Sequence, residues 1–408
     1  MNAFSSVSAT STAWLRDSVF APFVPTYVDH LTSLQYATGT TRAYLGCVAH
    51  FAHWSLRRSL DLGDLQFHFT AFVQDHLPRC NCARRVQRCP HQVRAALRHL
   101  PTVLASHGVA AVADTVGHNG AVLQRFDEHL EKARGLAAST RHQRLRIVES
   151  LIVGTSSATP TAPELRQFIA GELARVSPGS GSALVGALRS YLRFRAFEGD
   201  IVDHLLPVIS SPAHWRLAPL PQTLSVSELD RLLGAFPANL PSRLRAFAIV
   251  RCLVDLGLRS SEAINLNLDD IDWAAGTLCI AHGKSRRADV MPLPESTGKV
   301  IVEYLRSERP ATTSRRVFVR HVAPVNSPIG ADVVRNTVRA AYLRAGLPHT
   351  RVHILRHTLA SRLLATGGTL KEVADVLRHR ELDTSMIYAK VDWSRLVAVA
   401  MPWPGSAA

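Results

Sequence analysis

Cysteine and long apolar runs are both scarce in this sequence. Six cysteines in 408 residues are too few for the dense disulfide framework of a small secreted domain, and they indicate reduced thiols in a cytoplasmic protein. No stretch of about eighteen apolar residues occurs, so no transmembrane span is predicted. The N-terminal segment lacks the basic start and long apolar core of a secretory signal. Its serine, threonine and alanine content instead predicts a loose arm.

Acidic residues are also scarce relative to basic ones. Lys and Arg total 47 against 32 Asp and Glu, which leaves a formal net charge of +15. A solvated surface does not need such an imbalance, whereas a polyanionic partner explains it. Acidic lipid is the competing polyanion, but the basic residues are scattered over many expected helices instead of forming one cluster. The charge therefore favours a nucleic acid, DNA or RNA, over a membrane.

The apolar content is high enough for sizeable cores. Hydrophobic residues make up 47% of the chain, and the length suits two or three domains. Residues 23–105 and 120–215 both show helical periodicity. They also share a short pattern, since His30-Leu31 followed by Thr41-Arg42 recurs 99 residues later as His129-Leu130 followed by Thr140-Arg141. An internal duplication is one explanation of this parallel.

A proline-rich linker follows the second helical segment. Four prolines fall close together and cannot lie in regular helices: Pro207, Pro212, Pro219 and Pro221. We place the main boundary near residue 218. The predicted division is an N-terminal helical module at 1–110, a second helical domain at 115–217 and a C-terminal domain at 218–408.

The C-terminal domain is expected to be mainly helical with one small sheet. Capping boxes at Ser225–Glu228 and Thr369–Glu372 each open a helix. Two short strands, 277–281 and 288–293, flank a basic tip and predict a hairpin. The remaining expected helices lie at about 243–257, from about Ser260, at 298–308, 331–345 and 353–365, and around Tyr388. The fold class is therefore mainly α with a small β-sheet, an α+β domain preceded by helical domains.

The segment from Arg351 to Lys390 contains several polar side chains that could act together on one substrate. His353 and Arg356 lie three residues apart at the start of an apolar helical run, so they share one face. A guanidinium matches the oxygens of a phosphate, and the hydroxyl of Tyr388 can act as a nucleophile toward phosphorus. This combination favours a phosphodiester as the target.

Each candidate also has a purely structural explanation when taken alone. Arg259 could pair with Glu262 or Asp270 at a helix end, and Lys284 could lie on a solvated turn. His357 is as well placed as His353, and spacing alone cannot choose between them. His379 could cap a helix, and Tyr388 could be a core aromatic. The ordered set is far more specific than any member: Arg259, Lys284, His353, Arg356, His379 and Tyr388.

Residues 225–392 resemble the catalytic domain of the tyrosine recombinase (phage integrase) family. LGLRSSEAINLNLDDID resembles the first arginine box, with Arg259 and its acidic neighbour Glu262, and HGKSRRADVMPL resembles the hairpin that carries the catalytic lysine, Lys284. HILRHTLASRLL resembles the His-x-x-Arg box of His353 and Arg356.

LRHRELDTSMIYAKVD resembles the closing box of the same family, with His379 and Tyr388. Arg378 stands where that box usually has glycine, a departure that bears on the local turn. Residues 120–215 resemble the core-binding domain of the family more loosely, and residues 1–105 would be a second such module or an arm-binding domain.

The resemblance implies a site-specific recombinase, integrase or transposase acting on double-stranded DNA. Tyr388 would form a 3′-phosphotyrosyl bond, Arg259 and Arg356 would clamp the phosphate, and Lys284 would protonate the leaving oxygen. His353 would assist proton transfer, His379 would hydrogen-bond the phosphate, and Glu262 would orient Arg259. No metal, cofactor or ATP is expected.

The resemblance also implies a homotetramer on paired DNA sites, and a location in the cytoplasm at the nucleoid. The apolar tail from Trp393 to Met401 would pack on a neighbouring protomer or on its own domain. The alternatives are a type IB topoisomerase, which shares the phosphotyrosine chemistry, and a DNA-binding relative without catalysis.

A second group of potentially metal-binding residues lies in the N-terminal module. Cys80, Cys82, Cys89 and His91 follow one another at short spacing, as metal ligands do, although not in a common zinc-finger pattern. Arginines surround them. The segment therefore predicts either a zinc site or reduced thiols in a DNA-facing loop.

Overall fold

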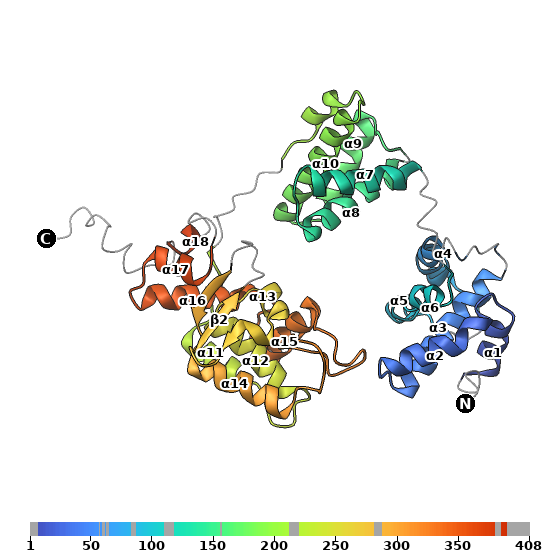
Figure 1. Ribbon diagram of the computed structural model, residues 1–408. Coiled ribbons are helices and arrows are strands. Elements are labelled where there is room, and N and C mark those ends of the chain that lie inside the picture. The colour runs from blue at the N-terminus through green and yellow to red at the C-terminus, as the bar shows by residue number, and fades with distance from the viewer. Residues whose placement is uncertain are drawn as a thin grey trace. The chain divides into compact units, whose positions relative to one another are not determined.

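The computed structural model describes residues 7–56, 58, 62, 65–82, 87–109, 118–155, 157–211, 220–280, 288–379 and 385–389 (Figure 1). The chain divides into two compact units, Met1–Leu31 with Thr38–Arg216, and Thr32–Ala37 with Leu217–Ala408. Among the described helices, none is long and apolar enough to cross a membrane. The three-domain division from the sequence stays a prediction.

The first described part of the chain is a helical bundle centred on α3. Its elements in chain order are α1 (Ala9–Arg16), η2 (Ala21–Phe23), α2 (Val24–Ser33), α3 (Thr38–Ser55), α4 (Leu65–Ala71), a π-helical turn η4 (Phe72–His76), η5 (Leu77–Arg79), α5 (Pro90–Leu97) and α6 (Leu100–Ser106). The α3 helix packs against both α1 and α5. Apolar residues on much of the surface of α3 allow it to be covered from two sides. Leu45, Val48 and Phe51 are fully or almost fully buried.

The prediction of a loose arm at the N-terminus is wrong for residues 9–16, which form α1. The side chain of Ser8 accepts a hydrogen bond from the backbone N–H of Ser11 and so caps the helix. Leu15 is completely buried, and the ring of Trp14 stacks on that of His53 with centroids 4.1 Å apart. Serine and threonine favour irregular structure locally, but this tertiary packing outweighs that preference.

A second helical bundle follows in the same unit. It comprises α7 (His118–Lys132), α8 (Ala138–Thr155), α9 (Ala162–Leu173), α10 (Pro178–Phe197) and the 3₁₀ helix η6 (Asp203–Val208). Its core forms around Phe126, Tyr191 and Phe194, whose rings contact one another. Pro207 lies inside η6, so the linker expected from the prolines begins later than predicted.

The two halves of the proposed duplication occupy equivalent places in two helix pairs. Leu31 lies near the end of α2 and Leu130 near the end of α7, and both side chains are completely buried. The following helices, α3 and α8, are 18 residues long each. This agreement is what a duplication would produce, and the common origin of the pairs remains a hypothesis.

The second unit has the α+β pattern expected for the C-terminal domain. Its elements are α11 (Val226–Leu233), α12 (Arg243–Asp255), α13 (Ser260–Asn265), η7 (Leu268–Asp270), β1 (Ile271–Asp272), β2 (Thr277–Ile280), β3 (Asp289–Pro292), α14 (Glu295–Ser307), α15 (Ala331–Arg344), α16 (His353–Ala365), α17 (Leu370–Val376) and α18 (Met386–Ala389). Both predicted capping boxes form, at Ser225 and at Thr369. The expected fold class, mainly α with a small sheet, is confirmed.

The sheet is a three-stranded antiparallel meander in the order β1-β2-β3. The predicted hairpin pairs Cys279 with Val290, and β1 adds a short third strand that the sequence pattern did not indicate. With only two residues, Ile271 and Asp272, β1 is too short to show an alternating pattern. The tip of the hairpin, which carries Lys284, lies outside the described residues.

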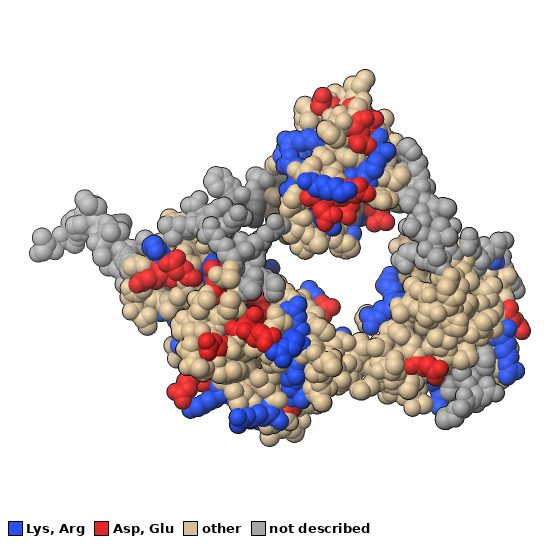
Figure 2. Space-filling view, viewed as in Figure 1, with Lys and Arg blue, Asp and Glu red and all other residues tan. Residues whose placement is uncertain are grey.

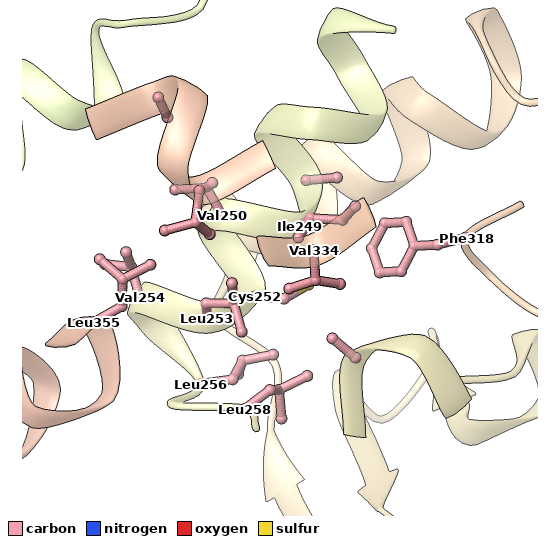
Figure 3. Close-up of a cluster of buried hydrophobic side chains, with 14 of the residues drawn as sticks. Ile249, Val250, Cys252, Leu253, Val254, Leu256, Leu258, Phe318, Val334 and Leu355 are labelled. Carbon is pink, nitrogen blue, oxygen red and sulfur yellow. The ribbon is translucent and has the colours of Figure 1, made fainter. Parts of the chain in front are cut away.

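Helix α12 forms the centre of the core of this unit. Ile249, Val250, Leu253 and Val254 are buried there together with side chains from other elements, including Phe318, Val334 and Leu355 (Figure 3). Side chains from other elements therefore surround α12. This packing holds its C-terminal end, after which the chain leads into the residues of the polar site.

Gly257 lies just beyond the end of α12, at the turn where the chain changes direction toward Arg259. Its φ of +56° lies in the left-handed region that glycine adopts without strain. A Cβ at this position would lie 2.9 Å from side-chain atoms of both Leu359 and Leu377. The missing side chain thus lets α16 and the end of α17 close over the turn that leads to Arg259.

Candidate functional site

Arg356, from the first turn of α16, lies at the centre of the polar site. It is only 4% exposed, and its two terminal nitrogens donate hydrogen bonds to the backbone carbonyls of Gly257 and Leu377. Burial, together with the nearby positive charges of Arg259 and Arg378, lowers its pKa to about 9. The side chain remains a cation at neutral pH and joins three segments of the fold.

Arg259 and Glu262 form a tight pair at the start of α13. The Arg259 backbone N–H donates to Glu262 Oε2 at 2.8 Å, and its guanidinium donates to Oε1 at 2.6 Å. The side chain of Glu262 is 1% exposed, whereas that of Arg259 is 20% exposed. The carboxylate is therefore an internal anchor, and the guanidinium that it orients reaches the surface.

Arg378 is a third arginine at this site and pairs with the same carboxylate as Arg259. Its Nη2 donates to Glu262 Oε2 at 2.9 Å, and its side chain is 4% exposed. Burial alone would raise the pKa of Glu262, but the charges and hydrogen bonds of Arg378 and Arg259 outweigh it, and the pKa lies below its usual value. Glu262 is therefore ionised at neutral pH.

The backbone at Arg378 keeps a conformation suited to glycine. Its φ is +53°, and its N–H donates to the Asp375 carbonyl at the end of α17. The left-handed turn expected of a glycine is thus preserved with arginine in its place. The turn also positions His379, whose N–H donates to the carbonyl of Ala374 at 2.9 Å.

Tyr388 lies on the short helix α18 and is 2% exposed. Its hydroxyl is 2.8 Å from Nδ1 of His357, with which it shares a hydrogen bond. Burial raises the pKa of Tyr388 to about 12, although the charges of Arg356 and Arg259 oppose this shift. The phenol is therefore neutral and sheltered, yet close enough to both arginines to experience their field.

His379 completes the cluster next to the tyrosine. Its Nδ1 is 2.6 Å from the hydroxyl of Ser385, and its ring lies parallel to that of Tyr388, with centroids 6.3 Å apart. Burial, followed by the charges of Arg356 and Arg259, lowers the pKa of His379 to about 4. The imidazole is therefore neutral at neutral pH and can donate or accept a hydrogen bond.

The fold brings most of the predicted site residues together. Arg259, Glu262, Arg356, His379 and Tyr388 are neighbours that perturb one another electrostatically or share hydrogen bonds. His353 is exposed in the first turn of α16, and its ring centroid is 6.4 Å from that of His357. Lys284 and the tail from Trp393 to Met401 lie outside the described residues, so their predicted roles stay predictions.

Three neighbours of the site were not among the predicted site residues. His357 holds the tyrosine hydroxyl, Ser385 holds His379, and Arg378 shares Glu262 with Arg259. Two of them carry a signal in the sequence, since Arg378 replaces an expected glycine and His357 is as well placed as His353, whereas Ser385 carries none. The choice between His353 and His357 required the three-dimensional contact, which spacing along a helix cannot supply.

A groove beside the site is lined by β3 and the end of α17. Val290 and Met291 come from the strand, and Asp375, Arg378 and His379 from the helix and the turn after it. Arg378 Nη1 lies 3.1 Å from the sulfur of Met291, so strand β3 directly contacts the arginine cluster. The hairpin that carries Lys284 is therefore attached next to the site.

The cysteine-rich cluster predicted from the sequence assembles only in part. Cys80 and Cys82 lie together, whereas Cys89 and His91 are exposed and do not belong to the group. Two histidines take their places, His76, four residues before Cys80, and His50, thirty residues before it, since their ring nitrogens lie beside the two sulfurs.

Comparison with known proteins places this site in a family. Residues 222–395 match the family model described as the phage integrase family. An integrase/recombinase, y4rA, described as putative, of Sinorhizobium fredii (strain NBRC 101917 / NGR234) is 33% identical over 400 residues, which cover 95% of each chain. The tyrosine recombinase XerD of Lacticaseibacillus casei is 29% identical over 287 residues, which cover 67% of this chain and 95% of XerD.

Solved structures give the same picture of the fold. The XerH site-specific recombinase, bound to its palindromic difH substrate, aligns with a TM-score of 0.54 at 20% identity, covering 85% of this chain and 98% of XerH. A lambda integrase fragment bound to a core site aligns with a TM-score of 0.53 at 16% identity, covering 66% of this chain and 94% of the fragment. Because y4rA is 33% identical to this chain and the match covers 95% of both proteins, the chain belongs to the phage integrase family of tyrosine recombinases.

Proposed function

We propose that this chain is a site-specific recombinase that cuts and rejoins double-stranded DNA through a 3′-phosphotyrosyl intermediate. One observation carries the proposal. Three arginines gather around a single carboxylate, Glu262, with the hydroxyl of Tyr388 close by. Among these groups the positive charges exceed the negative charge, so the cluster favours an additional anion, and a DNA phosphate is the anion that a tyrosine nucleophile would attack.

The arginines would stabilise the transition state as a preorganised clamp. Glu262 fixes the guanidinium of Arg259, and two backbone carbonyls fix that of Arg356. A guanidinium has five N–H donors, so each still has donors for the non-bridging oxygens of a phosphate. Because the donors are already oriented, little reorganisation is needed when charge develops on those oxygens.

The covalent step exchanges one phosphoester bond for another. The Tyr388 oxygen forms a bond to phosphorus while the bond to the 5′-oxygen breaks, leaving a 3′-phosphotyrosyl link and a 5′-hydroxyl. The tyrosine proton passes to a histidine, with His353 the expected group and His357 its present partner. Lys284 would donate a proton to the leaving oxygen. The reverse attack by a 5′-hydroxyl rejoins DNA without ATP.

His379 and Ser385 would prepare the phosphate contact. Since the Ser385 hydroxyl is 2.6 Å from Nδ1 of His379, that contact fixes the ring and leaves Nε2 for a phosphate oxygen. The neutral state of this histidine, which burial favours, allows Nε2–H to act as a donor when Nδ1 accepts from serine.

The charge of the chain supports DNA as the substrate. Figure 2 shows basic side chains, interspersed with acidic ones, on the visible face of both units, in keeping with the net charge of +15. Most of the affinity would then come from phosphate contacts and would fall steeply with added salt. We further propose that the helical N-terminal unit supplies DNA contacts, that the active form is a tetramer on two sites, and that it works in the cytoplasm at the nucleoid.

A nicked suicide substrate, which loses the short cleaved strand and traps the covalent complex, tests the proposal. The wild type should give a protein–DNA adduct that resists denaturant, and Tyr388→Phe should give none while still shifting the DNA in a gel. Tyr342→Phe, which removes the hydroxyl of another buried tyrosine in the same unit, should leave the adduct intact. An undiminished adduct in Tyr388→Phe would refute the assignment.

The same preparation separates recombination from topoisomerase activity. A recombinase should produce exchanged products only from plasmids that carry two target sites. Relaxation of plasmids with a single site, without exchanged products from two, would instead indicate a type IB topoisomerase. DNA binding with no adduct from any substrate would indicate a non-catalytic relative.

A further inference from the structure

Four potential metal ligands converge in the N-terminal bundle, far from the site in the second unit along the sequence. His50 lies on α3, His76 ends the π-helical turn η4, and Cys80 and Cys82 follow η5. One nitrogen or sulfur atom from each lies within 4.8 Å of all the others. The family site already described uses none of these residues.

The distances between these atoms match a tetrahedral metal site. His50 Nε2 lies 3.2 Å from His76 Nε2 and 3.3 Å from Cys80 Sγ, and His76 Nε2 lies 3.6 Å from Cys82 Sγ. Ligands of a tetrahedral zinc ion, with Zn–N near 2.05 Å and Zn–S near 2.3 Å, are about 3.3 Å apart for two nitrogens and about 3.6 Å for nitrogen and sulfur. The arrangement therefore has the size that one zinc ion requires.

Hydrogen bonding alone explains the arrangement less well. His50 Nδ1 is 3.0 Å from the carbonyl of Gln87, which can only accept, so the ring carries its proton on Nδ1. The single lone pair on Nε2 then faces two neighbours at once, the His76 nitrogen and the Cys80 sulfur. A cation between them would satisfy all of these atoms together.

The surroundings also suit a structural metal. The contact between His50 and the carbonyl of Gln87 is the type that orients a histidine ligand and fixes its tautomer. The ring of Phe72 packs on both histidines, with centroids 5.0 Å from His50 and 5.2 Å from His76. The two thiolates would neutralise a divalent ion, so the complex could lie in this partly apolar shell without net charge.

We propose that His50, His76, Cys80 and Cys82 bind one zinc ion that holds the segment after α4 against α3. Two nitrogens and two sulfurs favour zinc over magnesium or calcium, which prefer oxygen ligands. The ion would fix Cys80 and Cys82 beside the exposed Arg79, and the exposed Arg88 donates to the carbonyl of Cys82 at 2.9 Å. Two of the four residues suggested by sequence spacing, Cys89 and His91, are not ligands.

The first test measures metal in the unmodified full-length protein. Elemental analysis after exhaustive dialysis should find about one zinc per chain, as expected of a closed four-ligand site. Replacing zinc with cobalt should produce visible ligand-field bands and a thiolate-to-cobalt absorption in the near ultraviolet. A wild-type protein that retains less than about a tenth of an equivalent after refolding with zinc, and gives no thiolate–cobalt absorption, would overturn the proposal.

The second test locates the metal without relying on variants that could misfold. Alkylation followed by peptide mass spectrometry should show Cys80 and Cys82 protected until a chelator is added. Cys89, which is exposed, should react with or without the chelator and serves as the internal control. Equal reactivity of all three cysteines in protein that contains zinc would place the metal elsewhere.

Matched variants then sharpen the assignment. Cys82→Ser and His76→Ala should each lose at least about nine-tenths of the bound zinc at nanomolar free metal, because a three-ligand site is open and weaker. Cys89→Ser and His91→Ala, in the same stretch of sequence, should keep it. Loss of zinc in the second pair but not in the first would reject the proposed ligand set.

Discussion

The two polar clusters of this chain are built in opposite ways. Around His50 and Cys80, two imidazole nitrogens and two sulfur atoms lie close together, and the ring of Phe72 packs on both histidines. Around Glu262, three guanidinium groups gather near one carboxylate. The first cluster therefore suits the proposed cation, and the second suits the proposed anion.

The two clusters also differ in how far their side chains are buried. The side chain of Glu262 is 1% exposed, but the side chain of Arg259 that it orients is 20% exposed, so the second cluster keeps one open side. In the first cluster His50 is completely buried and both cysteines are half-buried, which suits a closed structural site. A cluster that serves chemistry must remain accessible, whereas one that serves stability gains from being closed.

Replacing Arg356 with alanine should have the largest effect and tests the need for an anion in the second cluster. The rate of covalent adduct formation should fall by about a hundred- to a thousand-fold, because one preorganised donor group for the phosphate is lost. Arg362→Ala, an exposed arginine on the same helix, should cleave at nearly the wild-type rate. Single-turnover cleavage of the suicide substrate measures both, and equal rates in the two variants would contradict the clamp.

Replacing Glu262 with glutamine tests whether the carboxylate anchors the arginines. Two buried ion pairs would be lost, and the free energy of unfolding should fall by about 3 kcal/mol. Glu295→Gln removes the exposed partner of Lys299 and should cause little measurable change. Urea titration compares the variants. A phosphate or sulfate salt stabilises folded proteins in general, so only a larger gain for the Glu262 variant than for the Glu295 variant would indicate that the cluster binds anions.

Acid should weaken the second cluster through its histidines. Burial, and then the neighbouring His353 and Arg356, lower the pKa of His357 from 6.5 to about 4. The unfolded chain therefore binds more protons between these values, and stability is lost as the pH falls from 6.5 toward 4. Because one imidazole exchanges at most one proton, His357 contributes no more than about 1.4 kcal/mol per pH unit to this slope, and its partial exposure reduces that contribution. His357→Gln should show a shallower decline in urea titrations over this range, and an unchanged slope would contradict it.

Two substitutions at Arg378 should give the smallest difference and isolate its backbone conformation. Both Arg378→Gly and Arg378→Ala remove the pair with Glu262 and should be less stable than the wild type. The glycine variant should be the more stable of the two by about 1 kcal/mol, because a φ of +53° strains every residue that has a Cβ. Thermal unfolding of both proteins gives the difference. Equal stability would mean that the turn relaxes when the arginine is removed.

The sequence predicted the second unit well because its signals are local. Capping boxes at Ser225 and Thr369, the glycine at 257 and the hairpin pattern each depend on a few adjacent residues, and each has the predicted structure. The site residues could be proposed because the boxes that contain them resemble a known family. The contacts of His357 and Ser385 could not be predicted, since they join elements through packing that no short pattern records.

The N-terminal unit shows why spacing alone is a weaker guide. Spacing correctly predicts that Cys80 and Cys82 lie together, but it suggests Cys89 and His91 as their neighbours instead of His50 and His76. His50 comes from a helix thirty residues earlier, and only the packing of α3 brings its ring to Cys80. In the same way, the serine and threonine content of the N-terminal segment predicts a loose arm, and the packing of α1 on α3, which lies later in the sequence, makes part of it a helix.

The hydrogen bond between Tyr388 and His357 has a consequence for the enzyme away from its substrate. With the phenol 2% exposed and held at 2.8 Å by the imidazole, in-line attack requires the side chain to leave this shelter first. With Tyr388 as the proposed nucleophile, a chain in this state would leave no nicks after random collisions with DNA. Damage to the genome would thus be limited by the resting form itself, before any recognition of sequence takes place.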